Sequence, residues 1–234
     1  MRPHVIVNVA MSADGKISTR ERRQVRISGS QDFTRVDRLK AGCDAIMVGI
    51  GTVLADDPSL TVKSEECREY RRKHGWDDNP VRIVIDSSGR TPYDSSFLNK
   101  GQGKRVIAVS KKADPDSVSH LRNKASVIIG GENEVDLSLL LDNLGAMGIH
   151  RMMVEGGGTL ISGLIRAGLV DEIYTFIGNI IIGGRDAPTL ADGDGFIIES
   201  SFTRLRLLDA SRIEEGILLH WIVLDPEKKS SFQG

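Results

Sequence analysis

The chain has 234 residues, a net charge of −1 and 27% charged residues, so it lacks the strongly basic surface of a nucleic-acid-binding protein. At this length we expect one α/β domain over residues 1–234 that buries roughly 70% of its unfolded surface without a disulfide or metal. Cys43 and Cys67 are the only cysteines. They exclude a disulfide framework and a zinc site, and they indicate a reducing compartment.

The first predicted element is a buried strand over residues 5–11. The run is short, contains Asn8 and is followed by Asp14 and Lys16, which argues against a signal peptide or a membrane span and favours a cytoplasmic protein. An unsatisfied buried amide costs about 1–3 kcal/mol. Asn8 therefore either braces the strand or contacts a ligand.

A helix is predicted over residues 31–41, with Ser28 or Ser30 as its cap and Gly42 at its end. Residues at helical spacing suggest its inner face. They are Phe33, Val36, and Leu39 or Lys40.

Residues 45–50 form an apolar run typical of a strand buried on both faces, and a glycine-rich turn follows. Thr52 and Asp56 lie four residues apart, so one helical turn places them on the same face, and Pro58 limits that turn. Because Asp56 and Asp57 repel a phosphate, hydroxyl or amide donors suit Asp56 better. The alternative is a solvated acidic corner after a buried strand.

The charged stretch 64–79 is typical of a solvated loop or a frayed helix. A strand is predicted over residues 81–86, and a polar turn, Ser87-Ser88-Gly89-Arg90, follows it. The rigid fork of an arginine beside two hydroxyls and a glycine suits a phosphate monoester. An ordinary surface turn is the alternative.

Strands over 105–110 and 125–129 alternate with helices over 114–123 and 136–147. This alternation predicts a mainly parallel central sheet flanked by helices. Two alternating segments at the end of the chain, 203–209 and 216–224, have no helix between them. They predict a C-terminal antiparallel hairpin at the sheet edge.

A further strand, residues 151–155, runs into three glycines, Gly156 to Gly158, and a helix predicted from about Thr159. Free backbone N–H groups at such a helix start suit a diphosphate. The spacing differs from the Rossmann G-x-G-x-x-G pattern. Glu155 either faces hydrogen-bond donors of a polar ring or caps the helix.

Together these segments resemble the reductases of riboflavin biosynthesis, which share the dihydrofolate reductase-like fold. The chain is more similar to the stand-alone archaeal and fungal type than to the bacterial bifunctional type, because it lacks the H-x-E and P-C-x-x-C deaminase signature. The resemblance extends over nearly the whole chain. Its motifs are residues 8–17, 27–32, 44–62, 81–90, 154–160, 168–173 and 183–190.

The resemblance implies NADPH-dependent reduction of the ribose C1′ of a ribosylaminopyrimidine 5′-phosphate, in a homodimer that uses no metal. The implied catalytic residues are Asp56 and Glu155. The implied cofactor residues are Thr52 and Asp56 for the nicotinamide half, Ser87, Ser88, Gly89 and Arg90 for the 2′-phosphate, and Gly156, Gly157, Gly158 and Thr159 for the diphosphate. The implied substrate residues are Lys40, Leu60, Lys63 and Glu155, with Gln24 and Arg26 in a variable loop.

Two other functions fit parts of the same pattern. A pterin or dihydrofolate-type reductase on the same fold would use the same cofactor with a different ring pocket. A non-catalytic module that senses NADPH would keep the glycine loops without needing Glu155 and the two lysines.

Overall fold

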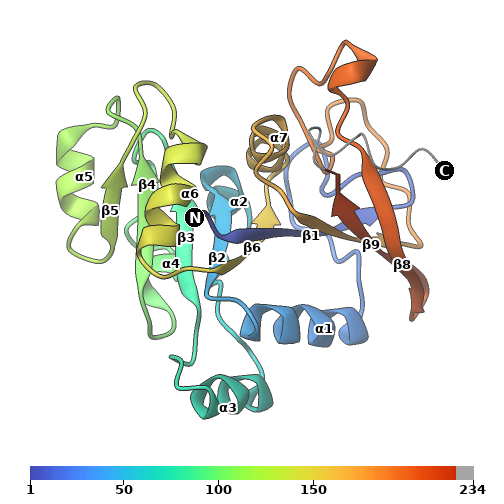
Figure 1. Cartoon of the computed structure of the whole chain (residues 1–234), viewed down its shortest axis with the longest axis horizontal. Helices are drawn as coiled ribbons and strands as arrows, with labels where there is room; N and C mark the ends of the chain where they lie inside the picture. The colour runs from blue at the N-terminus through green and yellow to red at the C-terminus, as the bar shows by residue number, and fades with distance from the viewer. Residues whose placement is uncertain (225–234) are drawn as a thin grey trace.

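The computed structural model describes residues 1–224, in which nine strands form one sheet of order β5-β4-β3-β2-β6-β1-β7-β9-β8 (Figure 1). The first seven strands in this order pair in parallel, whereas β9 pairs antiparallel with both of its neighbours, β7 and β8. This confirms the predicted mainly parallel sheet with a C-terminal hairpin. The strands are β1 His4–Ser12, β2 Ala45–Gly49, β3 Val81–Ile85, β4 Arg105–Val109, β5 Ser126–Ile129, β6 Arg151–Gly156, β7 Glu172–Gly178, β8 Leu205–Ile213 and β9 Gly216–Val223.

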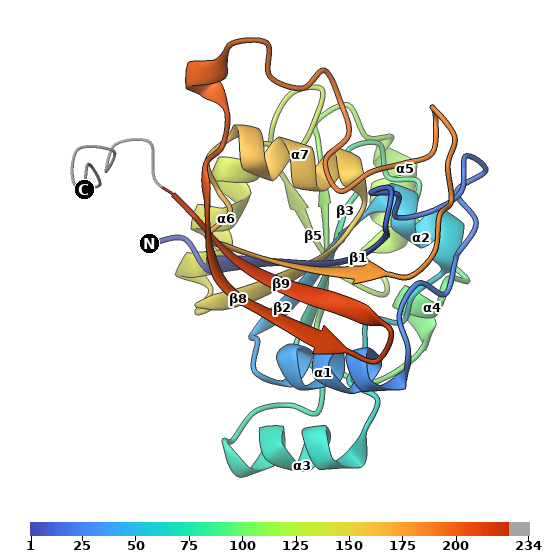
Figure 2. The ribbon, with the colours of Figure 1, turned by 90° about the vertical axis from the view of Figure 1, so that its right-hand side faces the viewer.

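Helices cover both faces of the sheet, with α6 and α7 on one side, and α1 on the other with α3 beyond it (Figure 2). No helix in residues 1–224 is long and apolar enough to cross a membrane. The helices are α1 Ser30–Ala41, α2 Ile50–Asp56, α3 Glu65–Lys73, α4 Ser96–Asn99, α5 Pro115–Leu121, α6 Leu137–Ala146 and α7 Gly158–Arg166, with a 3₁₀ turn at Glu199–Ser201.

The apolar run of β2 is buried on both faces, as its sequence predicted. Ala45 and Met47 pack into the core beneath α6 and α7, while Ile46 and Val48 pack into the core on the opposite face. Because side chains alternate across a strand, an unbroken apolar run is required where helices cover both sides. β2 therefore lies in the interior, and its carboxyl end opens toward the loops.

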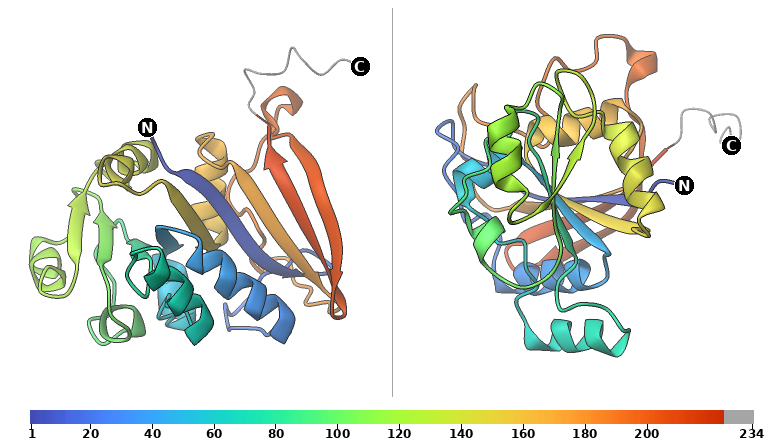
Figure 3. Two further views of the ribbon diagram at one scale, coloured as in Figure 1. Left: turned by 60° about the horizontal axis from the view of Figure 1, so that its bottom comes forward. Right: turned by 90° about the vertical axis from the view of Figure 1, so that its left-hand side faces the viewer.

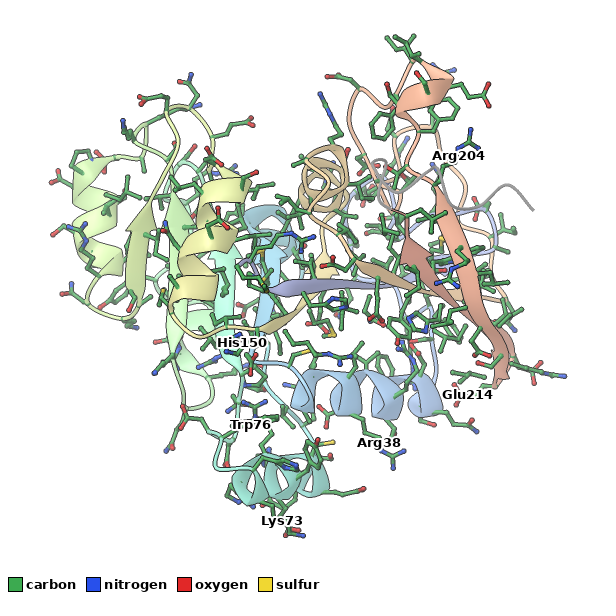
Figure 4. All side chains as sticks on the ribbon, viewed as in Figure 1. Arg38, Lys73, Trp76, His150, Arg204 and Glu214 are labelled. Carbon is green, nitrogen blue, oxygen red and sulfur yellow. The ribbon has the colours of Figure 1, made fainter. Side chains whose placement is uncertain are left out.

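The expected cap of α1 by Ser28 or Ser30 is wrong. The N-cap is Gly29, and the Glu214 carboxylate accepts hydrogen bonds from the Gln31 N–H and the Ser30 hydroxyl, both at 3.2 Å. A Cβ on Gly29 would lie 2.0 Å from a Glu214 oxygen, so only glycine leaves room for this carboxylate. Glu214 comes from the distant tip of the β8–β9 hairpin, next to the start of α1 (Figure 4).

The inner face of α1 is confirmed at Val36 and Leu39, which pack against the core, but it is wrong at Phe33. Phe33 is half exposed beneath the Arg26 guanidinium, whereas Asp32 and Asp37 are buried. Asp37 accepts hydrogen bonds from the backbone N–H groups of Lys63 and Ser64. The polar side of α1 therefore fixes a neighbouring segment of backbone, which an apolar periodicity does not reveal.

The charged stretch 64–79 is more ordered than a solvated loop. Ser64 caps α3, and Arg71 is buried, with its guanidinium donating to the carbonyl oxygens of Ala41, Cys43 and Asp77. The same guanidinium lies over the ring of Trp76, which is labelled beside α3 in Figure 4. One arginine thus docks α3 against the end of α1.

The C-terminal hairpin is confirmed, although its first strand ends at Ile213 and not at residue 209, and β8 forms the edge of the sheet opposite β5 (Figure 3, left). Glu172 links three strands, because its two oxygens lie 2.7 and 2.8 Å from the Nε2 atoms of His4 and His220. Burial alone raises the pKa of Glu172, but these hydrogen bonds outweigh it and lower the pKa below its usual value. The carboxylate is therefore stabilised in its charged form.

Candidate active site

The two glycine-rich loops lie side by side at the carboxyl edge of the sheet. Strands β2 and β6 are neighbours, and their pairing sets Val48 beside Gly156. A Cβ on Gly157 would lie 3.4 Å from the Thr52 hydroxyl. The tertiary structure therefore joins the loop after β2 and the loop after β6 into one surface.

The glycine loop after β6 lies close to the backbone of a neighbouring segment. Gly156 has φ +143°, and the Gly156–Gly157 peptide is cis. A Cβ on Gly158 would lie 2.6 Å from both the Thr189 carbonyl oxygen and an Asp192 carboxylate oxygen. Helix α7 begins there without a side-chain cap, so its first N–H groups suit the phosphates of a dinucleotide.

Two adjacent carboxylates after β2 have different partners. Asp57 caps α4, because its two oxygens accept hydrogen bonds from the Ser96 N–H at 2.6 Å and the Ser96 hydroxyl at 2.7 Å. Asp56 lies on α2 together with Thr52, as the spacing predicted. Asp56 is an exposed residue, yet neighbouring atoms exclude enough water to raise its pKa. Asp57 is therefore structural, and Asp56 is the carboxylate open to a ligand.

The turn after β3 has one open cation. The Ser87 hydroxyl accepts a hydrogen bond from the Val135 N–H, and Gly89 has φ +72°. The Arg90 side chain is 60% exposed, and its Nε lies 4.0 Å from the nearer oxygen of buried Asp86. Its guanidinium is consequently only loosely paired with Asp86 and is accessible to an anion. A hollow of about 320 Å³ adjoins the turn, lined by Gly89, Thr91, Asp114, Asp116, Ser117, His120 and Leu121.

The expected substrate residues Lys40 and Glu155 form an ion pair of 2.7 Å, with side chains 14% and 17% exposed. Lys40 comes from the last turn of α1, and Glu155 comes from the end of β6. Lys63 lies close enough for the Lys40 charge to act on it. Burial, and next the charge of Lys40, lower the pKa of Lys63.

Lys63 has neutral partners at its ammonium group. Its Nζ donates to the hydroxyls of Ser59 and Thr61 at 2.7 and 2.9 Å. Hydroxyl groups solvate the Lys63 charge without forming an ion pair with it, and Asp37 and Glu155 act on it only through their charges, whereas Lys40 is directly paired with Glu155. Lys63 is thus the better placed of the two lysines to bind a phosphate.

Asn8 lies beside this ion pair. The pairing of Val7 with Val154 places the next residues, Asn8 and Glu155, next to each other on β1 and β6. The Asn8 side-chain oxygen accepts a hydrogen bond from Arg35 at 2.8 Å. Of the two roles considered for Asn8, this contact supports the brace between sheet and helix.

Three further expected residues have less direct links to the site. Leu60 has φ +54°, and its side chain is buried in the core on the α1 face of the sheet. It therefore packs beneath the segment of residues 59–63 that carries Lys63. Gln24 and Arg26 are exposed. The roles of these three residues in substrate binding stay predictions.

Sequence reasoning missed two arginines next to the site. Arg35 bridges Asp32 and Asn8, and Arg82 lies buried beneath the segment that carries Lys63. The available signal was a cation inside the otherwise apolar strand 81–85. Within residues 1–224, no three His, Cys, Asp or Glu side chains are grouped to hold a metal.

A further hollow, of about 560 Å³, lies elsewhere, around the amino ends of β3, β4 and β5. None of the expected site residues lines it. We assign the site to the carboxyl edge of the sheet, and not to this hollow, because the ion pair, the glycine loops and the accessible cations lie at that edge.

Comparisons with known proteins match nearly the whole chain. The family model described as RibD C-terminal domain matches residues 3–219. A 2,5-diamino-6-ribosylamino-4(3H)-pyrimidinone 5′-phosphate reductase of Archaeoglobus fulgidus is 52% identical over 216 residues, covering 92% of this chain and 96% of the relative. The protein of the same name from Methanothermobacter thermautotrophicus is 46% identical over 223 residues, covering 95% and 99%.

A solved structure supports the architecture. A pyrimidine reductase-like protein of Corynebacterium diphtheriae superposes with a TM-score of 0.83 at 19% identity, covering 95% of this chain and 92% of that one. At this identity the likeness concerns the fold alone. It confirms the α/β architecture expected from the sequence resemblance.

Proposed function

The chain belongs to the RibD C-terminal domain family, and from this premise we propose that it reduces the ribose C1′ of 2,5-diamino-6-ribosylamino-4(3H)-pyrimidinone 5′-phosphate with NADPH. The product is the corresponding ribitylamino compound of riboflavin biosynthesis. The observation that carries the proposal is the grouping of Lys40, Lys63 and Glu155 beside two joined glycine loops.

The substrate phosphate is assigned to Lys63, with Lys40 beside it. Both are point charges without the bidentate fork of arginine, so the hydroxyls of Ser59 and Thr61 help fix the position of the Lys63 ammonium. Glu155 is an acceptor that suits the amino groups of a diaminopyrimidine ring. Its pairing with Lys40 also holds the carboxylate in one orientation.

The cofactor residues follow the carboxyl edge of the sheet. Gly156 to Gly158 and Thr159 would hold the diphosphate, since helix α7 begins at these residues without a side-chain cap on its first N–H groups. Arg90, next to Ser87 and Ser88, would hold the 2′-phosphate that distinguishes NADPH from NADH. Thr52 and Asp56 would face the nicotinamide half. When bound, the nicotinamide supplies the hydride for the reduction.

The residues of the chain then have two tasks in catalysis. The first is orientation, because the open-chain imine form of the substrate must present C1′ at about 3–3.5 Å from the donor carbon. The second is delivery of one proton to the imine nitrogen, which becomes the amine. Asp56 and Glu155 are the carboxyl groups assigned to this step, directly or through a water molecule, and the raised pKa of Asp56 favours it as the donor.

The test is NADPH oxidation, followed by nicotinamide absorbance, with the diamino substrate, its deaminated counterpart and dihydrofolate in parallel. We expect turnover with the first and a strong loss in Glu155→Ala and Asp56→Ala. Turnover with dihydrofolate alone would indicate a pterin-type reductase. Binding of NADPH without turnover of any substrate would indicate a sensing module and contradict the proposal.

The proposal includes a cytoplasmic homodimer built from one domain per chain. Two buried free thiols suit a reducing compartment. The edge strand β8 exposes Leu205, Leu207 and Leu208, and an unpaired apolar edge is a suitable surface for a second copy. Light scattering after size-exclusion chromatography tests this, because Leu207→Glu should convert a dimer into a monomer.

A further inference from the structure

Arg82, the second residue of β3, is fully buried beneath two loops. Within residues 1–224 no carboxylate pairs with it, and its Nε has no hydrogen-bond partner. Burial, together with the charge of Arg105, lowers its pKa to about 10. Its guanidinium donates only to backbone carbonyl oxygens, those of Ser59 (3.1 Å), Lys100 (2.6 Å), Gly101 (3.2 Å), Gln102 (3.3 Å) and Gly103 (3.5 Å).

Burying a cation without a counterion costs free energy. We therefore ask what the contacts of Arg82 achieve. One of its contacts leads directly to the site. Nη1 of Arg82 joins the Ser59 carbonyl to the Lys100 carbonyl, and the Ser59 hydroxyl in turn accepts a hydrogen bond from the Lys63 ammonium. Arg82 thus stands directly behind the segment that orients Lys63.

The two loops that Arg82 joins also pack tightly on each other. Gly101 has φ +70°, and a Cβ there would lie 2.5 Å from Cγ2 of Thr61, whose hydroxyl is the second acceptor for the Lys63 ammonium. Lys100 lies close enough for its charge to act on Lys63. The loop over residues 100–103 therefore supports the 59–63 segment and adds a third lysine to its surroundings.

We propose that Arg82 is a positioning residue for the substrate phosphate, which fixes the carbonyl groups of Ser59 and Lys100 and so holds Lys63 in its phosphate-binding position. The inference rests on the proposed function, because it takes Lys63 to bind the phosphate. A dianionic ligand suits this place, since the cations Lys40, Lys63, Lys100 and Arg82 outnumber the nearby carboxylates Asp37 and Glu155.

Arg105 provides a matched control. Its guanidinium donates to the carbonyl oxygens of Gly101 and Gly103, in the same turn that Arg82 binds, and to that of Phe97 on α4. It has no hydrogen bond to the 59–63 segment. Loss of Arg105 therefore weakens the turn, while the link from Arg82 to Ser59 remains.

The experiment compares Arg82→Met, Arg82→Lys, Arg105→Met and Lys63→Ala in the full chain. It measures KM and kcat for the phosphorylated substrate, the Kd of ribose 5-phosphate by calorimetry, the Kd of NADPH and the melting temperature. For Arg82→Met we expect KM and the ribose 5-phosphate Kd to rise about tenfold, with kcat and the NADPH Kd changed less than about twofold. Arg82→Lys keeps the charge but cannot bridge both loops, so its rise is intermediate.

Arg105→Met should lower the melting temperature but leave both constants within about twofold of the parent protein. Equal rises in Arg105→Met and Arg82→Met would overturn the inference, as would a folded Arg82→Met with an unchanged KM. If Arg82→Met does not fold, Arg82→Lys decides in the same way. If Lys63→Ala leaves both constants unchanged, the phosphate assignment of the proposed function fails, and the inference is refuted with it.

Discussion

The ion pair between Lys40 and Glu155 leads to a quantitative prediction, tested by the four proteins of a double-mutant cycle: the parent, Lys40→Ala, Glu155→Ala and the double variant. At 2.7 Å and an effective dielectric constant of about 20, the attraction is about 6 kcal/mol before desolvation. Exposed pairs contribute about 0.2–1 kcal/mol, and breaking a fully buried pair costs about 3–5 kcal/mol. With side chains 14% and 17% exposed, we expect a coupling free energy of about 1–2 kcal/mol.

The assay is urea unfolding of all four proteins at pH 7, with NADPH oxidation measured on each. Coupling below about 0.3 kcal/mol would refute the reasoning, because effects of independent sites add within roughly that limit. The double variant should also be more stable than the sum of the two single losses predicts, since neither charge is then left unpaired. In activity, Glu155→Ala should lose more than Lys40→Ala, because Lys63 still offers its charge to the phosphate.

Three further predictions concern single contacts. Asp57→Ala should destabilise the protein by about 1–2 kcal/mol in urea unfolding, because the cap of α4 is lost. Asp56→Ala should leave stability within about 0.5 kcal/mol and lower activity. The reverse pattern would contradict the assignment. Because the pKa of Glu172 is lower in the folded protein than its usual value, its carboxylate stabilises the fold above about pH 4.5, and this stabilisation is lost as the pH falls through the folded pKa. Glu172→Gln should therefore reduce the loss of stability at acid pH. An unchanged acid limb of the stability-pH profile would show that Glu172 does not contribute in this way. Glu214→Gln should cost about 1 kcal/mol in thermal unfolding if the hairpin tip caps α1, with Glu215→Gln as the neutral control.

Local pattern was sufficient for most elements of the fold. The apolar run 45–50 predicted the strand β2, whose side chains reach a core on each face. The four-residue spacing of Thr52 and Asp56 predicted the short helix α2. Both depend on neighbours in sequence, because strand and helix periodicity are properties of the backbone itself.

Local pattern failed where a partner comes from far along the chain. The carboxylate that accepts hydrogen bonds at the start of α1 belongs to Glu214, more than 180 residues away. No local signal shows that this residue, and not Ser28 or Ser30, has that role. The adjacent carboxylates Asp56 and Asp57 were indistinguishable as sequence letters. Only the folded chain sets Ser96 beside one of them.

The site shows the same division. The sequence by itself determined which residue types are available for the proposed chemistry, because the glycines, lysines and carboxylates were predicted from their motifs and from the family resemblance. Only the tertiary structure decided that Glu155 neutralises Lys40 and that Lys63 keeps its charge among hydroxyls, with the unpaired cation Arg82 behind it. The reason is physical: residue type sets the charge that a group can carry, but the distance and burial of other groups set how much of that charge a ligand meets.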